Sequence, residues 1–405
     1  MPSANIPRGD VLSAARKYRD GVLAALDGGG WSADVEAAAQ AAVQRLTRAR
    51  RETLTPRTGR AALATAQTLA FIVAPLYAAA RLLDFAPAWT ALPLLVLAGM
   101  GMYGGLAILH DLAHSSFLPS RRVNSACGYF LAPFLLMEFG GFRRSHLGHH
   151  RYIQSACDPK RFGVEHKEET RDPEHSSLRL CPAPVRPALR LRQFLYLAVV
   201  PVIMGPAVLL FSGEFSVARR DWRRLESWLA TVASLLLLAL LYALSPRALA
   251  SFVIALLIAH SFTFHVFATH MSPSQVYWTS PRRSGMADAL NVSDIHCGAL
   301  PRWLGHGLSN YHSLHHLLPS IPCYHLPAAE ALVASDLAPL RAPAINLLDP
   351  AGSALLFDGI FSGVVYKNRD AWDYARDGGM RRIATPEADS GAREVVIPEP
   401  DATRG

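Results

Sequence analysis

Residues 310–322 read NYHSLHHLLPSIP and hold three histidines at the spacing H-x-x-H-H, namely His312, His315 and His316. On a helix, positions i, i+3 and i+4 lie on one face, so the three imidazoles can aim at one point. Side chains gathered in this way are typical of metal ligands. The rest of the sequence is best interpreted outward from this cluster.

Two more histidine clusters stand upstream. HLGHH repeats the H-x-x-H-H spacing, and HDLAH separates its two histidines by about one helical turn. Their members are His110, His114, His146, His149 and His150. With 16 histidines in 405 residues, the H-x-x-H-H spacing should arise by chance in on the order of one in forty such chains. Three clusters in one chain therefore indicate metal binding rather than scattered core or surface histidines.

The number of clustered imidazoles predicts more than one metal ion. A closed structural zinc site takes about four ligands, and here eight histidines are available. Neutral imidazole suits iron, zinc, copper or nickel, and all-nitrogen coordination with open positions suits redox chemistry on dioxygen. We expect two ions, with iron as the occupant. A zinc hydrolase is the alternative that the residues alone leave open.

The composition is that of a membrane protein. Hydrophobic residues make up 51% of the chain and charged residues only 18%, and the mean hydropathy is +0.17. The net charge of +8 does not indicate nucleic acid binding, because the basic residues flank apolar runs and no aromatic–basic recognition motif accompanies them. The five cysteines form no C-x-x-C pair, so we expect them to be reduced and structural.

Four apolar runs are long enough to cross a bilayer, which takes about 20 helical residues. They occupy residues 61–82, 88–109, 226–245 and 249–270. The runs form two hairpins with turns at LDFAPAW and LSPRA, whereas arginines crowd the opposite ends. By the positive-inside rule, these arginine-rich ends, every histidine cluster and both termini face the cytosol. The expected location is the inner (cytoplasmic) membrane.

Two further apolar runs are not expected to span. Residues 126–139 are too few, and we expect them in the interface or beneath the histidine clusters. Residues 193–212 contain Pro201, Gly205 and Pro206 and have basic residues at both ends, which favours an in-plane or re-entrant segment. The predicted fold is an all-α integral membrane protein of two transmembrane hairpins, with in-plane helices and a cytosolic histidine-rich helical cap.

The chain divides into three predicted regions. The opening residues have no apolar stretch of the kind found in a signal peptide, and residues 10–27 and 33–52 are interpreted as helices. The last twenty residues, 386–405, are polar enough to be disordered. The regions are an N-terminal cytosolic helical region at 1–60, a membrane di-iron domain at 61–335 and a C-terminal cytosolic region at 336–405.

The clusters and their surroundings resemble the membrane fatty acid desaturases and hydroxylases, which use a histidine-bound di-iron centre. HDLAHSSF, GFRRSHLGHHRY and NYHSLHHLLPSIP are similar to that family's three histidine boxes, in the family's order, within about residues 60–335. The third box begins with His rather than Gln, and no H-P-G-G haem segment is fused, unlike the front-end desaturases. The resemblance implies that eight histidines bind two irons: His110, His114, His146, His149, His150, His312, His315 and His316.

The resemblance also implies the activity, an O2-dependent desaturation of an acyl chain carried by a lipid or thioester. Two electrons must come from outside, and the chain has no nucleotide or flavin fingerprint, so a separate ferredoxin- or cytochrome-like donor is expected. Alternatives within this class are hydroxylation, ketolation of a carotenoid-like lipid and oxidation of a specialised metabolite. A non-catalytic membrane protein that kept the fold is the alternative from another class. The sequence leaves the oligomeric state open.

A ninth ligand is expected at His270. In the family, a histidine often stands where the final span returns to the cytosol, and the rise of the span from Leu249 brings His270 about 30 Å across, level with the first box. His260 and His265 are expected to be hydrogen-bonded inside the bundle, and His296 is the competing ligand. The resemblance also places Asn310, directly before the third box, beside the ligands, and we assign it a catalytic role there.

Overall fold

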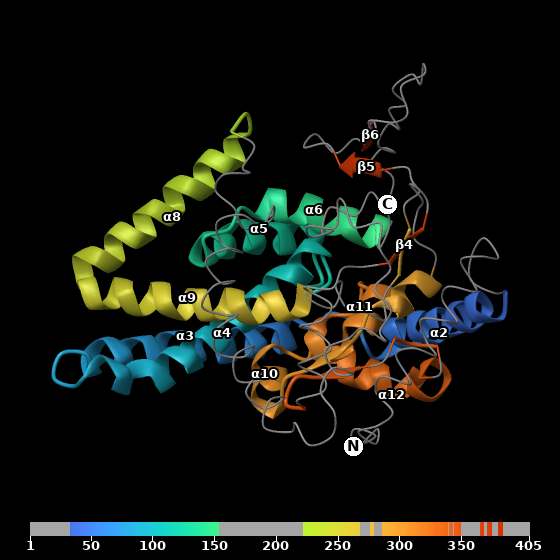
Figure 1. Cartoon of the computed structure of the whole chain (residues 1–405), viewed down its shortest axis with the longest axis horizontal. Coiled ribbons are helices and arrows are strands. Elements are labelled where there is room, and N and C mark those ends of the chain that lie inside the picture. The colour runs from blue at the N-terminus through green and yellow to red at the C-terminus, as the bar shows by residue number, and fades with distance from the viewer. Residues whose placement is uncertain are drawn as a thin grey trace.

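A computed structural model describes residues 33–153, 222–267 and 286–349 except 339 and 343, together with short strands at 276–278, 365–367, 371–374 and 380–383. Over these residues the protein is mostly helical (Figure 1). Three predicted segments, 10–27, 193–212 and 386–405, lie outside the described residues, and so does His270.

Four helices are long and apolar enough to cross a membrane, by length and composition. They are α3 (Thr58–Leu82), η1 with α4 (Ala88–Ala91 and Leu92–Ala113), α8 (Leu225–Leu244) and most of α9 (Pro246–Phe267). They coincide with the four predicted apolar runs to within a few residues. α4 runs past its predicted end as far as Ala113, so the first histidine cluster continues the helix. α4 contacts both α3 and α9, and α8 contacts α9 (Figure 1).

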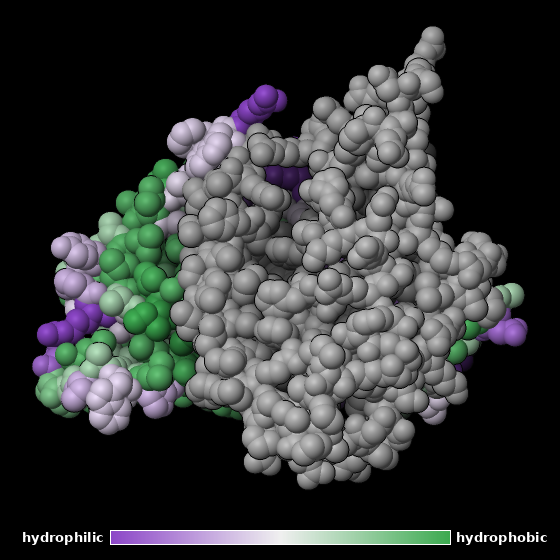
Figure 2. Space-filling view, in the orientation of Figure 1, coloured by the Kyte–Doolittle hydropathy of each residue, from purple (hydrophilic) through white to green (hydrophobic). Residues whose placement is uncertain are grey.

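The outer faces of these helices are apolar. Leu63 and Val73 on α3, and Leu229 and Leu236 on α8, are each at least 50% exposed. Figure 2 shows hydrophobic residues gathered on the left of the view, where α3, α8 and α9 lie in Figure 1. A contiguous apolar surface of this kind is costly in water and favourable in lipid, which supports an integral membrane protein.

The turns of the two helix pairs lie together. Arg247, at the start of α9, forms an ion pair with Asp84, which follows α3. We therefore expect both turns on the same side of the membrane, which the positive-inside rule predicts to be the non-cytosolic side. In a background without accessible native cysteines, Trp89→Cys should react with a membrane-impermeant thiol reagent only from the far side, and Arg122→Cys only from the cytosolic side. Labelling of both positions from one side would contradict the predicted orientation.

The predicted short run at 126–139 does not form one helix. It is divided between α5 (Arg121–Leu131), η2 (Ala132–Leu135) and the start of α6 (Phe139–Tyr152), with a bend of 106° between the two arms. A carbonyl group just before the bend finds a partner on a span: Ser234 Oγ on α8 donates to Pro133 O at 3.4 Å. Irregular backbone inside a membrane bundle needs such partners because no water is available there.

The expectation of an all-α fold is wrong in one respect. The described residues include six short strands in three two-stranded sheets. β1 (Val276–Trp278) pairs in parallel with β4 (Val365–Lys367), β2 (Ile295–His296) pairs in parallel with β3 (Ile345–Asn346), and β5 (Ala371–Tyr374) pairs antiparallel with β6 (Met380–Ile383). β1–β4 and β2–β3 join segments that are distant in sequence, and segments so short leave no readable period.

The third histidine cluster lies in a helical region at the opposite end of the bundle from the two turns (Figure 1). Its elements are α2 (Ala33–Glu52), η7 (Ala287–Asn291), α10 (Ala299–Leu304), η8 (Ser309–Tyr311), α11 (His312–Leu317), η9 (Cys323–His325) and α12 (Leu326–Leu337). α2, predicted at 33–52, packs against α12 and buries Ala39, Ala42 and Leu46. One continuous apolar core joins these elements to α4, so the cluster rests on a rigid base.

Candidate metal centre

Three helical segments bring the histidine clusters together. α4 contributes His110 and its C-cap residue His114, α6 contributes the second cluster and α11 the third. α4 ends here because Ser115 adopts a left-handed backbone with φ of 58°, and Ser116 N–H and Oγ–H both donate to Asp111 O. The chain then leaves the helix axis and leads toward α5 and α6.

Five imidazoles converge closely. One nitrogen from each lies within 4.8 Å of one nitrogen of every other, and the members are His110, His114, His146, His150 and His315. His114 Nε2 lies 2.7 Å from His146 Nε2, and His315 Nε2 lies 3.1 Å from His150 Nε2. All three boxes therefore contribute to one group of donor atoms.

The other three box histidines lie beside this group. His316 Nε2 is 3.1 Å from His312 Nε2, and the ring centroids of His149 and His316 are 4.9 Å apart. The two sets meet where the His150 and His316 rings stack with centroids 4.1 Å apart. Eight imidazoles thus form one continuous patch with two lobes.

Most of the box histidines are buried, and burial favours the neutral form of an imidazole. Six of them are less than 9% exposed, and His315 is fully buried. Burial, followed by neighbouring imidazoles, lowers the pKa of His150 and of His316 well below the ordinary value of 6.5. Neutral nitrogen is the form that binds a metal, so little proton release accompanies binding.

The spacing of the nitrogens fits a metal ion. A metal–nitrogen bond is about 2.1 Å long, so two ligands at right angles on one ion have nitrogens about 3.0 Å apart. The separations of 2.7, 3.1 and 3.1 Å lie around this value. An all-imidazole set suits iron, copper, nickel and zinc and disfavours calcium and magnesium.

Comparison with known proteins identifies the family. The family model described as "Fatty acid desaturase" matches residues 87–346. The chain belongs to the fatty acid desaturase family. It is also similar to the "Probable fatty acid desaturase DES1" of Sorghum bicolor, with 26% identity over 241 residues that cover 54% of this chain and 57% of the relative. The match thus spans little more than half the length of that protein.

Four histidines outside the boxes bear on the choice of a ninth ligand in this desaturase-family chain, namely His260, His265, His270 and His296. His260 lies on α9 and is fully buried in the bundle. His296 lies on β2 and is not a member of the five-imidazole group. His265 belongs to α9, but its side chain, like the whole of His270, lies outside what the structure describes.

Asn310 lies on η8, directly before α11, and is only 5% exposed. Among the described residues, its Oδ1 accepts no hydrogen bond. A buried amide oxygen without a donor is costly, so a ligand or water is its natural partner. A role for Asn310 beside the metal ligands stays a prediction.

Asp111, which the sequence reasoning left without a role, supports the first box. Its carboxylate is fully buried, and Oδ2 accepts the Cys323 N–H at 2.5 Å. Cys323 follows the third box, so this bond ties the first and third boxes together. An acidic residue in the apolar α4, directly beside His110, was the available signal, because charges in such segments usually have a specific function.

Asp294 supports the third box in a similar way. Its Oδ1 accepts the Ser313 N–H at 2.8 Å and its Oδ2 accepts the Ser313 hydroxyl at 3.0 Å, in the first turn of α11. Arg341 lies 4.0 Å from the same carboxylate and 2.8 Å from Glu330. Burial raises the pKa of Asp294 from 3.8 to about 6, and Arg341 opposes this shift. Nothing local in the sequence indicates this contact.

Proposed function

We propose that the protein is a membrane di-iron oxidoreductase that uses O2 and external electrons to desaturate an acyl chain of a lipid or thioester. The observation that carries the proposal is the group of five imidazoles, drawn from all three boxes with one nitrogen each within 4.8 Å of the others. The chain's membership of the fatty acid desaturase family supports the reaction type.

The two lobes of the patch divide the ligands between two ions. The five converging imidazoles would hold one ion, and His149, His312 and His316 would hold the second, with Asn310 and His270 as further contributors. When bound, iron supplies the oxidising power that removal of hydrogen from an unactivated C–H bond requires. The box imidazoles would bind the ions, burial favours the neutral form of His150 and His316, and the largely buried lobes would exclude water.

The electron donor would approach the arginine-rich side of the helical region. Exposed arginines stand on α2 and at the start of α3: Arg48, Arg51, Arg57 and Arg60. Such a surface favours an acidic ferredoxin- or cytochrome-like partner through electrostatic attraction. In this proposal the boxes and both termini face the cytosol, and the membrane di-iron domain at 61–335 lies between the cytosolic regions at 1–60 and 336–405.

Lipid analysis tests the function directly. We expect expression in a host of known fatty acid composition to produce new acyl chains that are two hydrogens lighter, and purified protein to carry about two irons per chain. A product that gains one oxygen would instead identify a hydroxylase. Iron-free, well-folded protein that leaves the host lipids unchanged would refute the proposal in favour of a non-catalytic membrane protein.

A further inference from the structure

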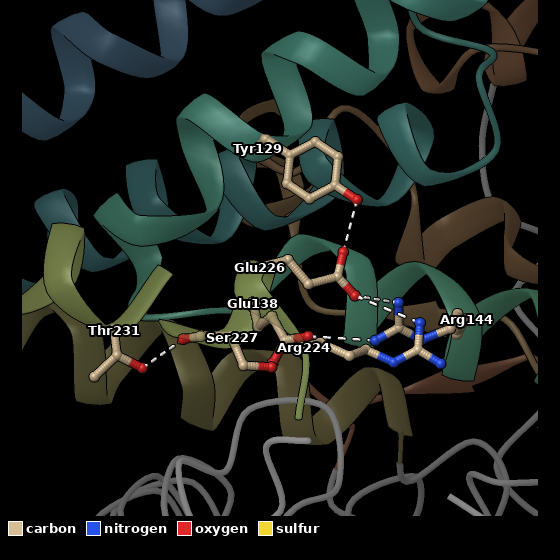
Figure 3. A network of polar contacts seen from close by, with 7 residues as sticks. All are labelled: Tyr129, Glu138, Arg144, Arg224, Glu226, Ser227 and Thr231. Carbon is tan, nitrogen blue, oxygen red and sulfur yellow. Dashed lines mark hydrogen bonds and ion pairs between the residues drawn. The ribbon is translucent and has the colours of Figure 1, made fainter. Parts of the chain in front are cut away.

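A network of charged and polar side chains joins α6, which carries the second histidine box, to the first turn of α8 (Figure 3). Arg144 of α6 forms an ion pair with Glu226 of α8 through one guanidinium nitrogen, and its other terminal nitrogen lies 3.3 Å from Glu138 Oε1. Glu138 is the N-cap residue of α6. One guanidinium thus bridges two carboxylates from two elements.

Both carboxylates are fully engaged. Tyr129 of α5 donates to Glu226 Oε2 at 2.9 Å, and Ser227 of α8 donates to Glu138 Oε2 at 2.7 Å. Arg224 lies 3.9 Å from Glu226 Oε1, so two positive groups balance two negative ones. Ser227 is fully buried, and Glu138 is only 6% exposed. A partly buried, charge-balanced network of this kind fixes geometry more firmly than an exposed ion pair.

Gly140 leaves the space that this arrangement needs. A side chain at Gly140, in the first turn of α6, would collide with the Glu226 carboxylate. Glycine therefore allows Glu226 to lie directly over α6 and reach Arg144. On the other side, Arg143 donates to Ser125 Oγ at 3.0 Å and to Ser115 Oγ at 3.4 Å, close to the first box.

Arg144 and the second histidine box lie on opposite faces of α6. With about 100° per residue, His146, His149 and His150 stand about 200°, 140° and 240° around the axis from Arg144. The mean direction of the three imidazoles is thus almost opposite to the guanidinium. A rotation of α6 by about 20° would move a side-chain nitrogen about 6 Å from the axis by about 2 Å, roughly the length of a metal–nitrogen bond.

We propose that Arg144 is a positioning residue, which sets the rotation of α6 through Glu226 and Glu138 and so aims the second histidine box at the metal ions. The proposal rests on the metal-binding role in the proposed function. It requires the fork of the guanidinium and not only its charge, since one lysine nitrogen cannot bridge the two carboxylates in the same way.

Metal binding by the full-length, detergent-purified protein tests the proposal without any substrate. The variants are Arg144→Ala, Arg144→Lys, Glu226→Gln and Gly140→Ala, with exposed Arg122→Ala and Glu52→Gln as matched controls. We expect Arg144→Ala to bind iron(II) about tenfold more weakly, as for other residues that orient metal ligands, and to shift the ligand-field absorption of cobalt(II)-loaded protein. Arg144→Lys should give the same shift, and both controls should resemble the wild type.

Gly140→Ala provides an independent test because it leaves every charge in place. It should reproduce the effect of Glu226→Gln, and it should add little in a Glu226→Ala background, where the collision is absent. Variants that only lose thermal stability, with iron affinity and cobalt spectrum unchanged in the folded fraction, would overturn the proposal. A wild-type protein that binds neither metal would overturn the di-iron function itself, and this inference with it.

Discussion

Replacement of His315 by alanine should abolish turnover and remove on the order of one iron per chain while the protein remains folded in the membrane. His315 is fully buried in the third box and belongs to the five-imidazole group, with its Nε2 3.1 Å from His150 Nε2. Alanine removes one of the five donor atoms of this group. Iron per chain by elemental analysis and product formation by lipid profiling measure the two effects.

His325 offers a matched control for this experiment. It lies ten residues further along, is also buried, and stands outside the five-imidazole group. His325→Ala should therefore keep wild-type iron content. Wild-type activity in His315→Ala would show that the boxes do not bind the catalytic metal, whereas equal iron loss in both variants would indicate a general loss of structure.

Replacement of Asp294 by alanine should lower the free energy of unfolding by about 3 kcal/mol and reduce iron content as well. The change leaves the N–H and hydroxyl of Ser313, a fully buried residue, without their acceptor, and it leaves Arg341 with Glu330 alone. α11 has only six residues and no capping side chain of its own, so Asp294 takes over this role from a distant segment. Thermal unfolding and elemental analysis report the two effects.

Two further substitutions sharpen this prediction. Asp294→Asn keeps one carbonyl oxygen for the Ser313 N–H, so we expect about half of the loss in stability. Asp34→Ala removes an exposed carboxylate from the first turn of α2, so it should lower the free energy of unfolding by less than about 1 kcal/mol and leave the iron content unchanged. If Asp294→Ala unfolds at the wild-type temperature and retains its iron, the carboxylate does not support the third box.

The features that the sequence predicts well are local ones. An apolar run of about 20 residues identifies a span within one segment, and all four predicted spans occur as helices close to the predicted bounds. The H-x-x-H-H spacing is also a local signal, because one helical turn brings His312, His315 and His316 onto one face. Membership of the desaturase family follows from the same segments, and the family match at 87–346 agrees with it.

Contacts between distant segments were decided only by the tertiary structure. His150 and His315 stand 165 residues apart, and only the packing of α6 and α11 around the end of α4 brings their nitrogens together. The short parallel strands, the bond from Ser313 to Asp294 and the bridge from Arg144 to Glu226 are of the same kind. No period within a helix or strand encodes such pairs, since each depends on how separate segments fill space around one core.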